Sequence, residues 1–331
     1  MERQLKQIEE AAGYIKRQVT LMEVCGGHTN VIVKYGLREL LPKNIKLVSG
    51  PGCPVCVTPQ HDIDSVMQLA LSGVAIATYG DMLRVPGSNK SLEEARASGA
   101  KVFEVYSATE VLKMQQEYPE IVFFGIGFET TAPMTAYLLS HGVTVYSSHR
   151  LIPPALKLIS KSRIDGFINP GHVSTIIGTK PYKSIAKPQA IAGFTKEGVL
   201  KAILCLLQLI KENSNKCVNC YPEAVREEGN KKAQQQIARH FNITDSEWRG
   251  IGTIAKSGLE PKKHDAKKKY IKLLEKIKTK KTNCRCGEVL IGKIEPQQCR
   301  LYGITCKPEH PQGACMVSEE GACAIHYRHG K

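Results

Sequence analysis

The chain has 331 residues, of which 42% are apolar, so it is too long for one ordinary domain and can build conventional hydrophobic cores. This composition excludes a largely disordered protein. The amino terminus is charged and lacks the apolar core of a signal peptide. The longest apolar runs, near 121–128 and 199–210, are shorter than the roughly 18–20 residues that a membrane-spanning helix needs. We therefore expect a cytoplasmic protein of two or three domains without a membrane span.

The formal net charge of +15 is concentrated in residues 256–281, which contain eleven lysines against Glu260, Asp265 and Glu275. One interpretation of this segment is a surface for nucleic acid or for an acidic partner. The other is the solvated face of an amphipathic helix, because apolar residues recur at helical spacing over 270–277. We favour the helix, since runs of like charge are most often only solvated.

Short apolar strands alternate with helical stretches over most of the chain. Residues 1–18 have the spacing of an amphipathic helix, and further helices are expected up to about residue 41, from about residue 60 and up to about residue 140. Strands are expected at 20–24, 45–48, 74–78, 121–126, 143–146, 164–168 and 190–192. Residues 195–281 are predicted to be helical. The alternation predicts an α/β fold with parallel sheets.

The predicted strands form two groups, before about residue 115 and after about residue 120. They predict two similar parallel-sheet α/β domains, at 1–118 and 119–270. The strands run into turns with unusual polar residues, which are Cys25–Thr29, Gly50–Cys56, Tyr79–Asp81, Gly127–Thr131, Ser147–His149 and Asn169–His172. Because open parallel sheets bind ligands beyond the carboxyl ends of their strands, we expect the motifs of one domain to gather at one edge of its sheet.

Two thiol motifs lie near the amino terminus. Cys53 and Cys56 form a CxxC motif at the expected start of a helix, where free N–H groups favour thiolate, so the pair suits dithiol redox chemistry or half of a metal site. Cys25 follows the preceding strand, with His28 three residues further on, and cysteine and imidazole both bind iron, copper or zinc. Cys25 as a buried apolar residue is the alternative. The adjacent Gly-Gly pair favours close approach to another group.

Other polar residues carry weaker signals. Glu129 and His172 lie in turns at strand ends, where each is either part of a site or a structural cap. Cys205 lies in an apolar helical run and is predicted to be a core residue. Cys217 and Cys220 form a second CxxC motif in a polar loop without another pair nearby, so we interpret it as incidental, with a zinc or redox role as the alternative.

Six cysteines fall within residues 271–331, at spacing C-x-C-x12-C-x6-C-x8-C-x7-C. They are Cys284, Cys286, Cys299, Cys306, Cys315 and Cys323. Four thiolates suffice for a cubane cluster and leave two thiols over. A structural zinc site usually shows two tidy CxxC or CxxH pairs, so irregularly spaced soft ligands favour iron–sulfur over zinc, and disulfides are disfavoured in a reducing compartment. Residues 271–331 therefore predict a small cysteine-rich iron–sulfur domain that its metal centre stabilises.

Two other functions stay open from the residues alone. A zinc-stabilised basic nucleic-acid-binding protein would account for the charge and for the carboxy-terminal cysteines. It predicts aromatic residues among the basic ones, yet only Tyr270 lies within 256–281, and it gives no role to Cys25, Cys53 and Cys56. A stand-alone thiol–disulfide oxidoreductase would use the CxxC motif without partner proteins.

Five motifs occur in a fixed order from about residue 20 to the carboxy terminus. They are Met22–Thr29 (MEVCGGHT), Gly50–Cys56 (GPGCPVC), Gly127–Thr131 (GFETT), Pro170–Gly178 (PGHVSTIIG) and Gly313–Cys323 (GACMVSEEGAC). In this combination the chain resembles the HypD family of hydrogenase maturation proteins. The resemblance implies assembly of the Fe(CN)2CO group of nickel–iron hydrogenases, with the partner HypC to help hold an iron atom and with HypE and HypF as the source of cyanide. It implies no nucleic-acid partner.

The resemblance also implies two similar α/β domains and a third domain like ferredoxin–thioredoxin reductase, where a 4Fe–4S cluster lies beside a redox-active disulfide. By position, the implied cluster ligands are Cys284, Cys299, Cys306 and Cys323. Cys286 and Cys315 correspond to the adjacent redox pair. Cys25 corresponds to the thiolate that holds the transient Fe(CN)2CO iron with HypC, and Cys53 and Cys56 to the second dithiol.

Electrons are then expected to pass from the cluster through the two thiol pairs, with His28, Glu129 and His172 as candidates for proton handling. We expect a redox-active assembly scaffold rather than a multiple-turnover enzyme. The family often has a histidine two residues after His28, where this chain has Asn30. The second CxxC motif, at 217–220, is outside the family pattern, which favours the incidental interpretation.

Overall fold

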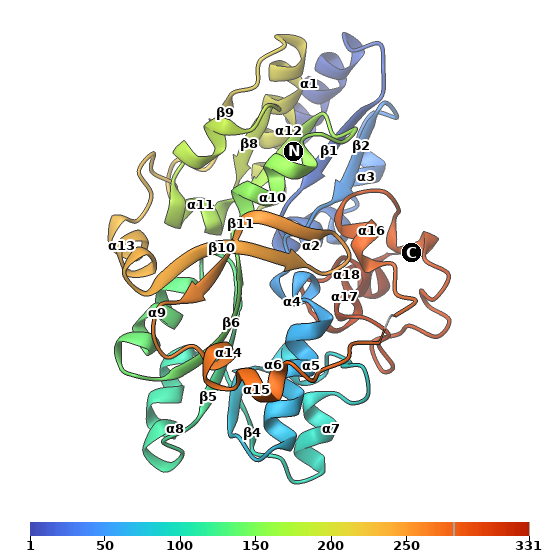
Figure 1. Cartoon of the computed structure of the whole chain (residues 1–331). Coiled ribbons are helices and arrows are strands. Elements are labelled where there is room, and N and C mark those ends of the chain that lie inside the picture. The colour runs from blue at the N-terminus through green and yellow to red at the C-terminus, as the bar shows by residue number, and fades with distance from the viewer. Residues whose placement is uncertain (281, 331) are drawn as a thin grey trace.

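The computed structural model describes residues 1–280 and 282–330, which form two β-sheets with a cysteine-rich segment beside them (Figure 1). Lys281, which ends the lysine-rich segment, and Lys331, which ends the predicted iron–sulfur domain, lie outside the described residues. Within the described part of the chain, no helix is both long enough and apolar enough to cross a lipid bilayer.

The first sheet has strand order β2-β1-β7-β8-β9, and all of its pairings are parallel. Its strands are β1 (Val19–Glu23), β2 (Ile45–Ser49), β7 (Gly166–Pro170), β8 (Gln189–Ala192) and β9 (Cys217–Asn219). Helix α12 (Lys196–Lys211) packs on β7 and β8, and helix α1 (Glu2–Gly13) packs on α12. Strands β7 and β8 are buried throughout, as expected for parallel strands covered by helices.

The second sheet has strand order β10-β11-β6-β5-β3-β4. Its strands are β3 (Ile76–Tyr79), β4 (Val102–Val105), β5 (Val122–Gly127), β6 (Thr144–Arg150), β10 (Phe241–Trp248) and β11 (Gly252–Pro261). Strands β3 to β6 pair in parallel, whereas the β10–β11 hairpin joins β6 in the antiparallel direction. The α/β prediction with parallel sheets is confirmed for the central strands, and the second sheet as a whole is mixed.

The strands do not group by their position in the chain. The first sheet takes β1 and β2 from before residue 118 and β7 to β9 from after it, and the second sheet also draws strands from both sides of that position. The predicted grouping of strands on either side of 118 and 119 is therefore wrong. Local patterns mark where a strand forms, but the pairing of β1 with β7 is a long-range contact that those patterns do not encode.

Helices near the motifs form as predicted, with some ends moved. The amino-terminal helix α1 ends at Gly13, and the helix expected up to residue 41 is divided into α2 (Gly26–Lys34) and α3 (Leu37–Leu40) at Gly36, where φ is +58°. The other helices are α4 (Pro54–Val57), α5 (Gln60–Leu71), α6 (Gly80–Leu83), α7 (Leu92–Ala97), α8 (Val111–Glu117), α9 (Ala132–Ser140), α10 (Ile152–Ile159), α11 (Gly171–Ile177), α13 (Lys231–His240), α14 (Ala266–Lys269) and α15 (Ile271–Leu274).

Residues 195–281 are not helical throughout, which corrects the sequence prediction. They contain α12 to α15, but β9, β10 and β11 occupy much of the remainder. The β10–β11 hairpin pairs with β6, and Trp248 at the end of β10 is fully buried. This pairing joins segments far apart in the sequence, so the local residue pattern does not reveal it.

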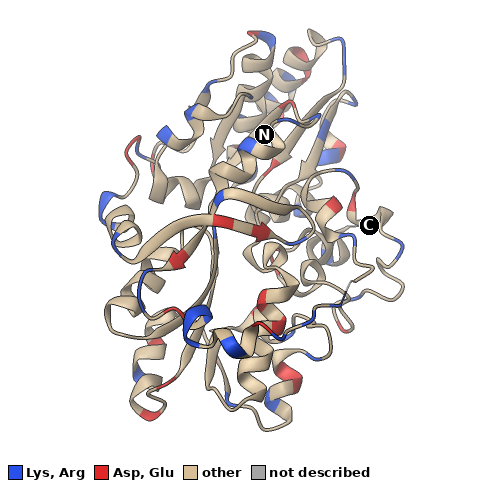
Figure 2. Ribbon diagram, viewed as in Figure 1, with Lys and Arg blue, Asp and Glu red and all other residues tan. Residues whose placement is uncertain are grey.

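The lysine-rich segment is likewise not one amphipathic helix. Its described residues comprise part of β11, the short helices α14 and α15, and stretches without regular secondary structure. Leu274 is buried, while Lys267 and Lys269 form ion pairs with Asp62 and Glu120. Figure 2 shows basic and acidic residues interspersed along the ribbon. The positive charge is therefore divided among several elements and partly paired with carboxylates.

The cysteine-rich segment contains the short helices α16 (Cys286–Leu290), α17 (Ala314–Val317) and α18 (Ala322–His329). Helix α17 packs against α4, which carries Cys56, and α18 packs against α2, which follows Cys25. Buried residues of α4 and α17 belong to one hydrophobic cluster. The segment thus shares its apolar core with the elements that carry the amino-terminal thiols.

Candidate functional site

A cleft of about 560 Å³ lies where strands of both sheets end. It is lined by residues at or just after the carboxyl ends of β1, β3, β4, β5 and β7, together with residues 318–320 of the cysteine-rich segment. Cys25 and His172 belong to this lining. Residues of five of the six predicted turns line this cleft, but the turns come from both sheets rather than from one predicted domain. Ser147–His149 is the exception, because these residues lie within β6 and are not part of the lining.

Cys25 lies between the end of β1 and the start of α2, where its backbone is extended (φ −161°, ψ 131°). Its backbone N–H donates to Glu23 Oε2 at 3.2 Å, and the Thr29 hydroxyl donates to Glu23 Oε1 at 2.5 Å. A Cβ built on Gly26 would lie 2.4 Å from the backbone oxygen of Glu320. The glycine after Cys25 therefore permits close packing of the cysteine-rich segment beside the thiol.

Burial raises the pKa values of the two acidic groups at this end of the cleft, Cys25 and Glu23. Burial, reinforced by the nearby Glu320 carboxylate, raises the pKa of Cys25 to about 12. Burial likewise raises the pKa of Glu23 to about 7, although hydrogen bonds from Thr29 and Ser49 oppose the shift. The thiol of Cys25 is protonated at neutral pH unless a cation displaces the proton.

The CxxC turn lies against Cys25. A Cβ built on Gly52 would lie 2.4 Å from the backbone nitrogen of Cys25, so the two turns touch through their main chains. Cys53 and Cys56 are buried and joined by a disulfide, and the N–H of Cys56 donates to Cys53 Sγ at 3.1 Å. Pro54, between them, lines the cleft. The predicted helix start is confirmed, since Cys53 caps α4.

His28 and His172 are linked through the ring of Phe194, whose centroid lies 4.9 Å from that of His28 and 4.0 Å from that of His172. His28 is fully buried, and its Nε2 donates to the carbonyl oxygens of Ala192 and Gly193, both at 3.2 Å. Burial lowers its pKa to about 4, so the ring is neutral at neutral pH. His172 is exposed in the cleft.

Glu129 turns away from the cleft that its neighbours Phe128 and Thr130 line. Its two carboxylate oxygens lie 3.1 and 3.3 Å from the backbone nitrogen of Ile152, at the start of α10. Burial raises its pKa to about 8, so the carboxyl is mostly protonated at neutral pH. The structure therefore brings Cys25, His28 and His172 together but places Glu129 behind the cleft wall.

The six carboxy-terminal cysteines line one small cavity, which we call the cysteine cage. They are Cys284, Cys286, Cys299, Cys306, Cys315 and Cys323. Among the described residues, no three His, Cys, Asp or Glu side chains converge as ligands of a single metal ion. A cubane cluster does not need ligands that converge on one ion, because each of its four iron atoms binds a separate thiolate. A cavity lined by several cysteine sulfurs is therefore compatible with such a cluster.

Thiols of the cysteine cage interact in pairs. The pKa of Cys284 is raised mainly by its interaction with Cys286 and, to a smaller extent, by burial. Interaction with Cys315 raises the pKa of Cys323, and the same contact lowers the pKa of Cys315. Each pair joins a predicted cluster ligand to a predicted redox thiol. The division into four ligands and one redox pair stays a prediction.

Comparison with known proteins connects these motifs to one family. A HypD family model, described as "Hydrogenase formation hypA family", matches residues 1–330. The chain belongs to the HypD family. It is 40% identical over 351 residues to the hydrogenase maturation factor HypD of Escherichia coli (strain K12), an alignment that covers 98% of this chain and 94% of the relative.

Similar relatives occur in other lineages. The chain is 41% identical over 344 residues to the hydrogenase maturation factor HypD of Rhizobium leguminosarum bv. viciae, covering 95% of this chain and 89% of that protein. It is 41% identical over 335 residues to a putative hydrogenase expression/formation protein of Methanocaldococcus jannaschii, covering 94% and 92%. The alignments extend over nearly the whole chain, so HypD membership applies to both sheets and to the cysteine cage.

The residues that the sequence analysis expected to differ from the family pattern are Asn30, Cys217 and Cys220, and all three lie outside the cleft lining. Asn30 is exposed on α2. The Cys220 thiol donates to Cys205 Sγ at 3.4 Å, and this contact lowers the pKa of Cys205 to about 7. Cys205, predicted to be core, is only half-buried. The second CxxC motif is therefore not a self-contained pair, because Cys220 contacts α12 rather than Cys217.

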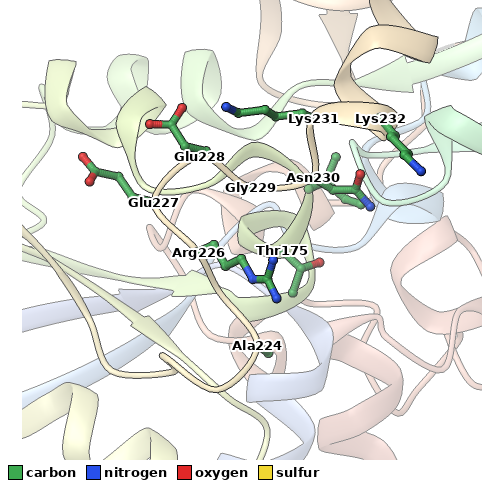
Figure 3. Close-up of a pocket in the computed structure, with 10 residues that line it drawn as sticks. Thr175, Ala224, Arg226, Glu227, Glu228, Gly229, Asn230, Lys231 and Lys232 are labelled. Atoms are coloured by element: carbon green, nitrogen blue, oxygen red, sulfur yellow. The ribbon is translucent and has the colours of Figure 1, made fainter.

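A second hollow, of about 770 Å³, lies between α11 and the loop that leads into α13 (Figure 3). Arg226 and Thr175 lie near each other on one side, while the acidic side chains extend outward (Figure 3). Glu227 and Glu228 pair with the exposed Lys183 and Lys180. Cys25 and the cysteine cage do not contribute to the described lining of this hollow. Its charged side chains are those of a solvated surface.

Sequence reasoning missed three residues next to Cys25. Glu23 lies inside the MEVCGGHT motif, and a carboxylate in an otherwise apolar strand end was the available signal. Glu320 lies inside the GACMVSEEGAC motif but is brought to Cys25 only by the docking of α18 on α2. Phe194 has no local signal, because its role depends on contacts with two histidines distant in sequence.

Proposed function

We propose that the protein is, with HypC, the scaffold and redox site on which the Fe(CN)2CO group of nickel–iron hydrogenases is assembled. The observation that supports this proposal is the double docking of the cysteine-rich segment. Its α17 packs on the CxxC helix α4, and its α18 packs on α2 beside Cys25. A site for cargo and a site for redox chemistry therefore adjoin in one apolar core.

In this proposal, iron is the cargo, and Cys25 holds it jointly with a cysteine of HypC. The half-buried thiol keeps its proton at neutral pH, and the charge of the arriving iron favours release of that proton as the Fe–S bond forms. Among the three predicted proton carriers, His172 is the best placed, because it is exposed in the cleft whereas His28 and Glu129 are buried. Cyanide reaches this cleft through HypE and HypF.

Cys284, Cys299, Cys306 and Cys323 would hold a 4Fe–4S cluster, which when bound supplies single electrons at low potential. Cys286 and Cys315 act as the dithiol beside it. In the proposed exchange, a thiolate of the reduced Cys286–Cys315 dithiol attacks the Cys53–Cys56 disulfide, so that this S–S bond breaks and a mixed disulfide forms. The second thiol of the pair then displaces the CxxC sulfur, the Cys286–Cys315 bond forms, and the dithiol has given two electrons and two protons to the CxxC pair. Packing of α17 on α4 supports this route, because it brings together the helices that carry Cys315 and Cys56. This many free cysteines is typical of a protein of the cytoplasm, where the reducing environment keeps thiols from forming disulfides.

Infrared spectroscopy of the protein purified with HypC tests the scaffold. We expect cyanide and carbonyl bands in the wild type and in Cys205→Ala, which removes a half-buried thiol outside the cleft lining. Cys25→Ala should lose the bands. Their absence from the wild type, or their persistence in Cys25→Ala, would refute the scaffold role.

Anaerobic iron and sulfide assays with electron paramagnetic resonance (EPR) test the cluster. We expect iron and sulfide in the ratio of a cubane, and a zinc-loaded, iron-free protein would contradict the assignment. Turnover of disulfide substrates without HypC would instead favour the stand-alone oxidoreductase.

A further inference from the structure

Arg249 joins the CxxC helix to the hairpin that crosses the molecule. Its side chain is 7% exposed. Its backbone N–H donates to the carbonyl oxygen of Val57 at 2.9 Å, and its Nε donates to that of Thr58 at 2.7 Å. Both carbonyls lie at the end of α4, where backbone acceptors lack helical partners. The arginine is therefore fixed by two main-chain contacts to the element that carries Cys56.

The turn that carries Arg249 is also fixed to the cysteine cage. Gly250 has φ +67°, and a Cβ built there would lie 2.6 Å from the Cα of Gly287. Gly287 directly follows Cys286, the first residue of α16. Glycine is required at position 250 both by the left-handed backbone and by this close approach. The β10–β11 turn thus touches the CxxC helix on one side and the cage on the other.

The guanidinium of Arg249 is incompletely paired. Its Nη2 is buried and has no hydrogen-bond partner within residues 1–280 and 282–330. In the same described residues, Arg249 forms no ion pair with a carboxylate. An unpaired buried cation is costly, so a nearby anion is expected to compensate it.

Arg249 directly precedes Gly250, whose contact with Gly287 places the arginine beside the backbone that follows Cys286. Arg285, which lies between Cys284 and Cys286, is occupied by a two-point ion pair with Glu288 at 2.6 and 2.7 Å. Arg249 is thus a buried arginine with a free donor, on a turn that adjoins the cage.

We propose that Arg249 is a potential-tuning residue, whose guanidinium stabilises the anionic cysteine cage and raises the reduction potential of the cluster held there. This inference rests on the proposed iron–sulfur function. Reduction adds one negative charge to the cage, and a buried positive charge nearby favours the more negative state, since few waters screen it. The contacts with α4 place the same charge beside the helix that receives the electrons.

EPR-monitored redox titration of the anaerobically purified protein tests the proposal. Arg249→Gln removes the charge, and Arg249→Lys retains it. Arg300→Gln is the matched control, because Arg300 is exposed and directly follows Cys299. We expect Arg249→Gln to make cluster reduction at least tenfold less favourable, a shift of about 59 mV to more negative potential for one electron. Arg249→Lys should shift by less than half of that, and Arg300→Gln should match the wild type.

Iron and sulfide contents, measured on the same samples, distinguish loss of the cluster from a change in its reduction potential. Loss of the cluster from Arg249→Gln but not from Arg249→Lys supports the charge as the compensating group. A full cluster with an unchanged potential in Arg249→Gln overturns the inference, and so does loss of the cluster from both variants, because backbone anchoring rather than charge would then be the requirement. A wild-type protein without iron and sulfide overturns the proposed function itself, which is distinguishable from failure of the Arg249 inference alone.

Discussion

Replacing Glu129 by glutamine tests whether the GFETT motif carries protons or stabilises the fold. Burial raises the pKa of this carboxyl from 4.5 to about 8, and Glu129→Gln imitates the protonated form in size. The Ile152 N–H can donate to the glutamine oxygen as it does to the carboxylate. The substitution therefore removes the titration and leaves the packing in place.

The size and sign of the effect follow from the two pKa values. Because the pKa is higher in the folded state, the contribution of Glu129 to stability is fully present below pH 4.5 and is lost as the pH rises through about 8. At about 1.36 kcal/mol per pKa unit, the loss reaches about 4 to 5 kcal/mol above pH 8. The Glu129→Gln protein does not undergo this loss, so its stability relative to the wild type should rise by that amount between pH 4.5 and pH 8.

Denaturant unfolding of both proteins at a series of pH values from 5 to 9 measures the difference. Glu212→Gln, which changes an exposed glutamate at the end of α12, is the control and should follow the wild type. Parallel curves for the wild type and Glu129→Gln would refute the buried, protonated carboxyl. Hydrogenase maturation, measured with the same variants, then separates the two roles: a stabilised but inactive Glu129→Gln protein indicates proton transfer, and an active one indicates a structural cap for α10.

Three further outcomes are expected. Phe167→Ala removes a fully buried ring from β7 and should lower the free energy of unfolding by about 3 to 5 kcal/mol in chemical denaturation. Arg150→Met leaves the buried Asp62 carboxylate without its 3.4 Å partner and should destabilise by a similar amount, about 3 to 5 kcal/mol, whereas an unchanged unfolding midpoint would show that Lys267 suffices. Mild oxidation should crosslink Cys205 to Cys220, whose sulfurs lie 3.4 Å apart, and peptide mass spectrometry that finds Cys217 in the crosslink instead would contradict the pairing.

The candidate site was largely predictable, because chemistry-bearing residues cluster in short motifs at strand ends. Cys25, His28 and the CxxC pair were identified from their turns, and the carboxyl-edge rule for parallel sheets correctly predicted that such turns meet. Glu129 shows the limit of that reasoning. Its turn lies at the cleft, but the side chain caps α10, a direction that depends on packing and not on the motif.

The α/β alternation, the helices around the motifs, the strand-end thiols and the HypD resemblance could all be predicted from the amino-acid sequence, because each depends on contiguous residues. Three features became visible only in the folded chain: β1 pairs with β7, the β10–β11 hairpin completes the second sheet, and this hairpin carries Arg249 to the cysteine cage. Those contacts join distant segments through buried surfaces and main-chain hydrogen bonds, and such pairings leave no periodic pattern in either partner alone.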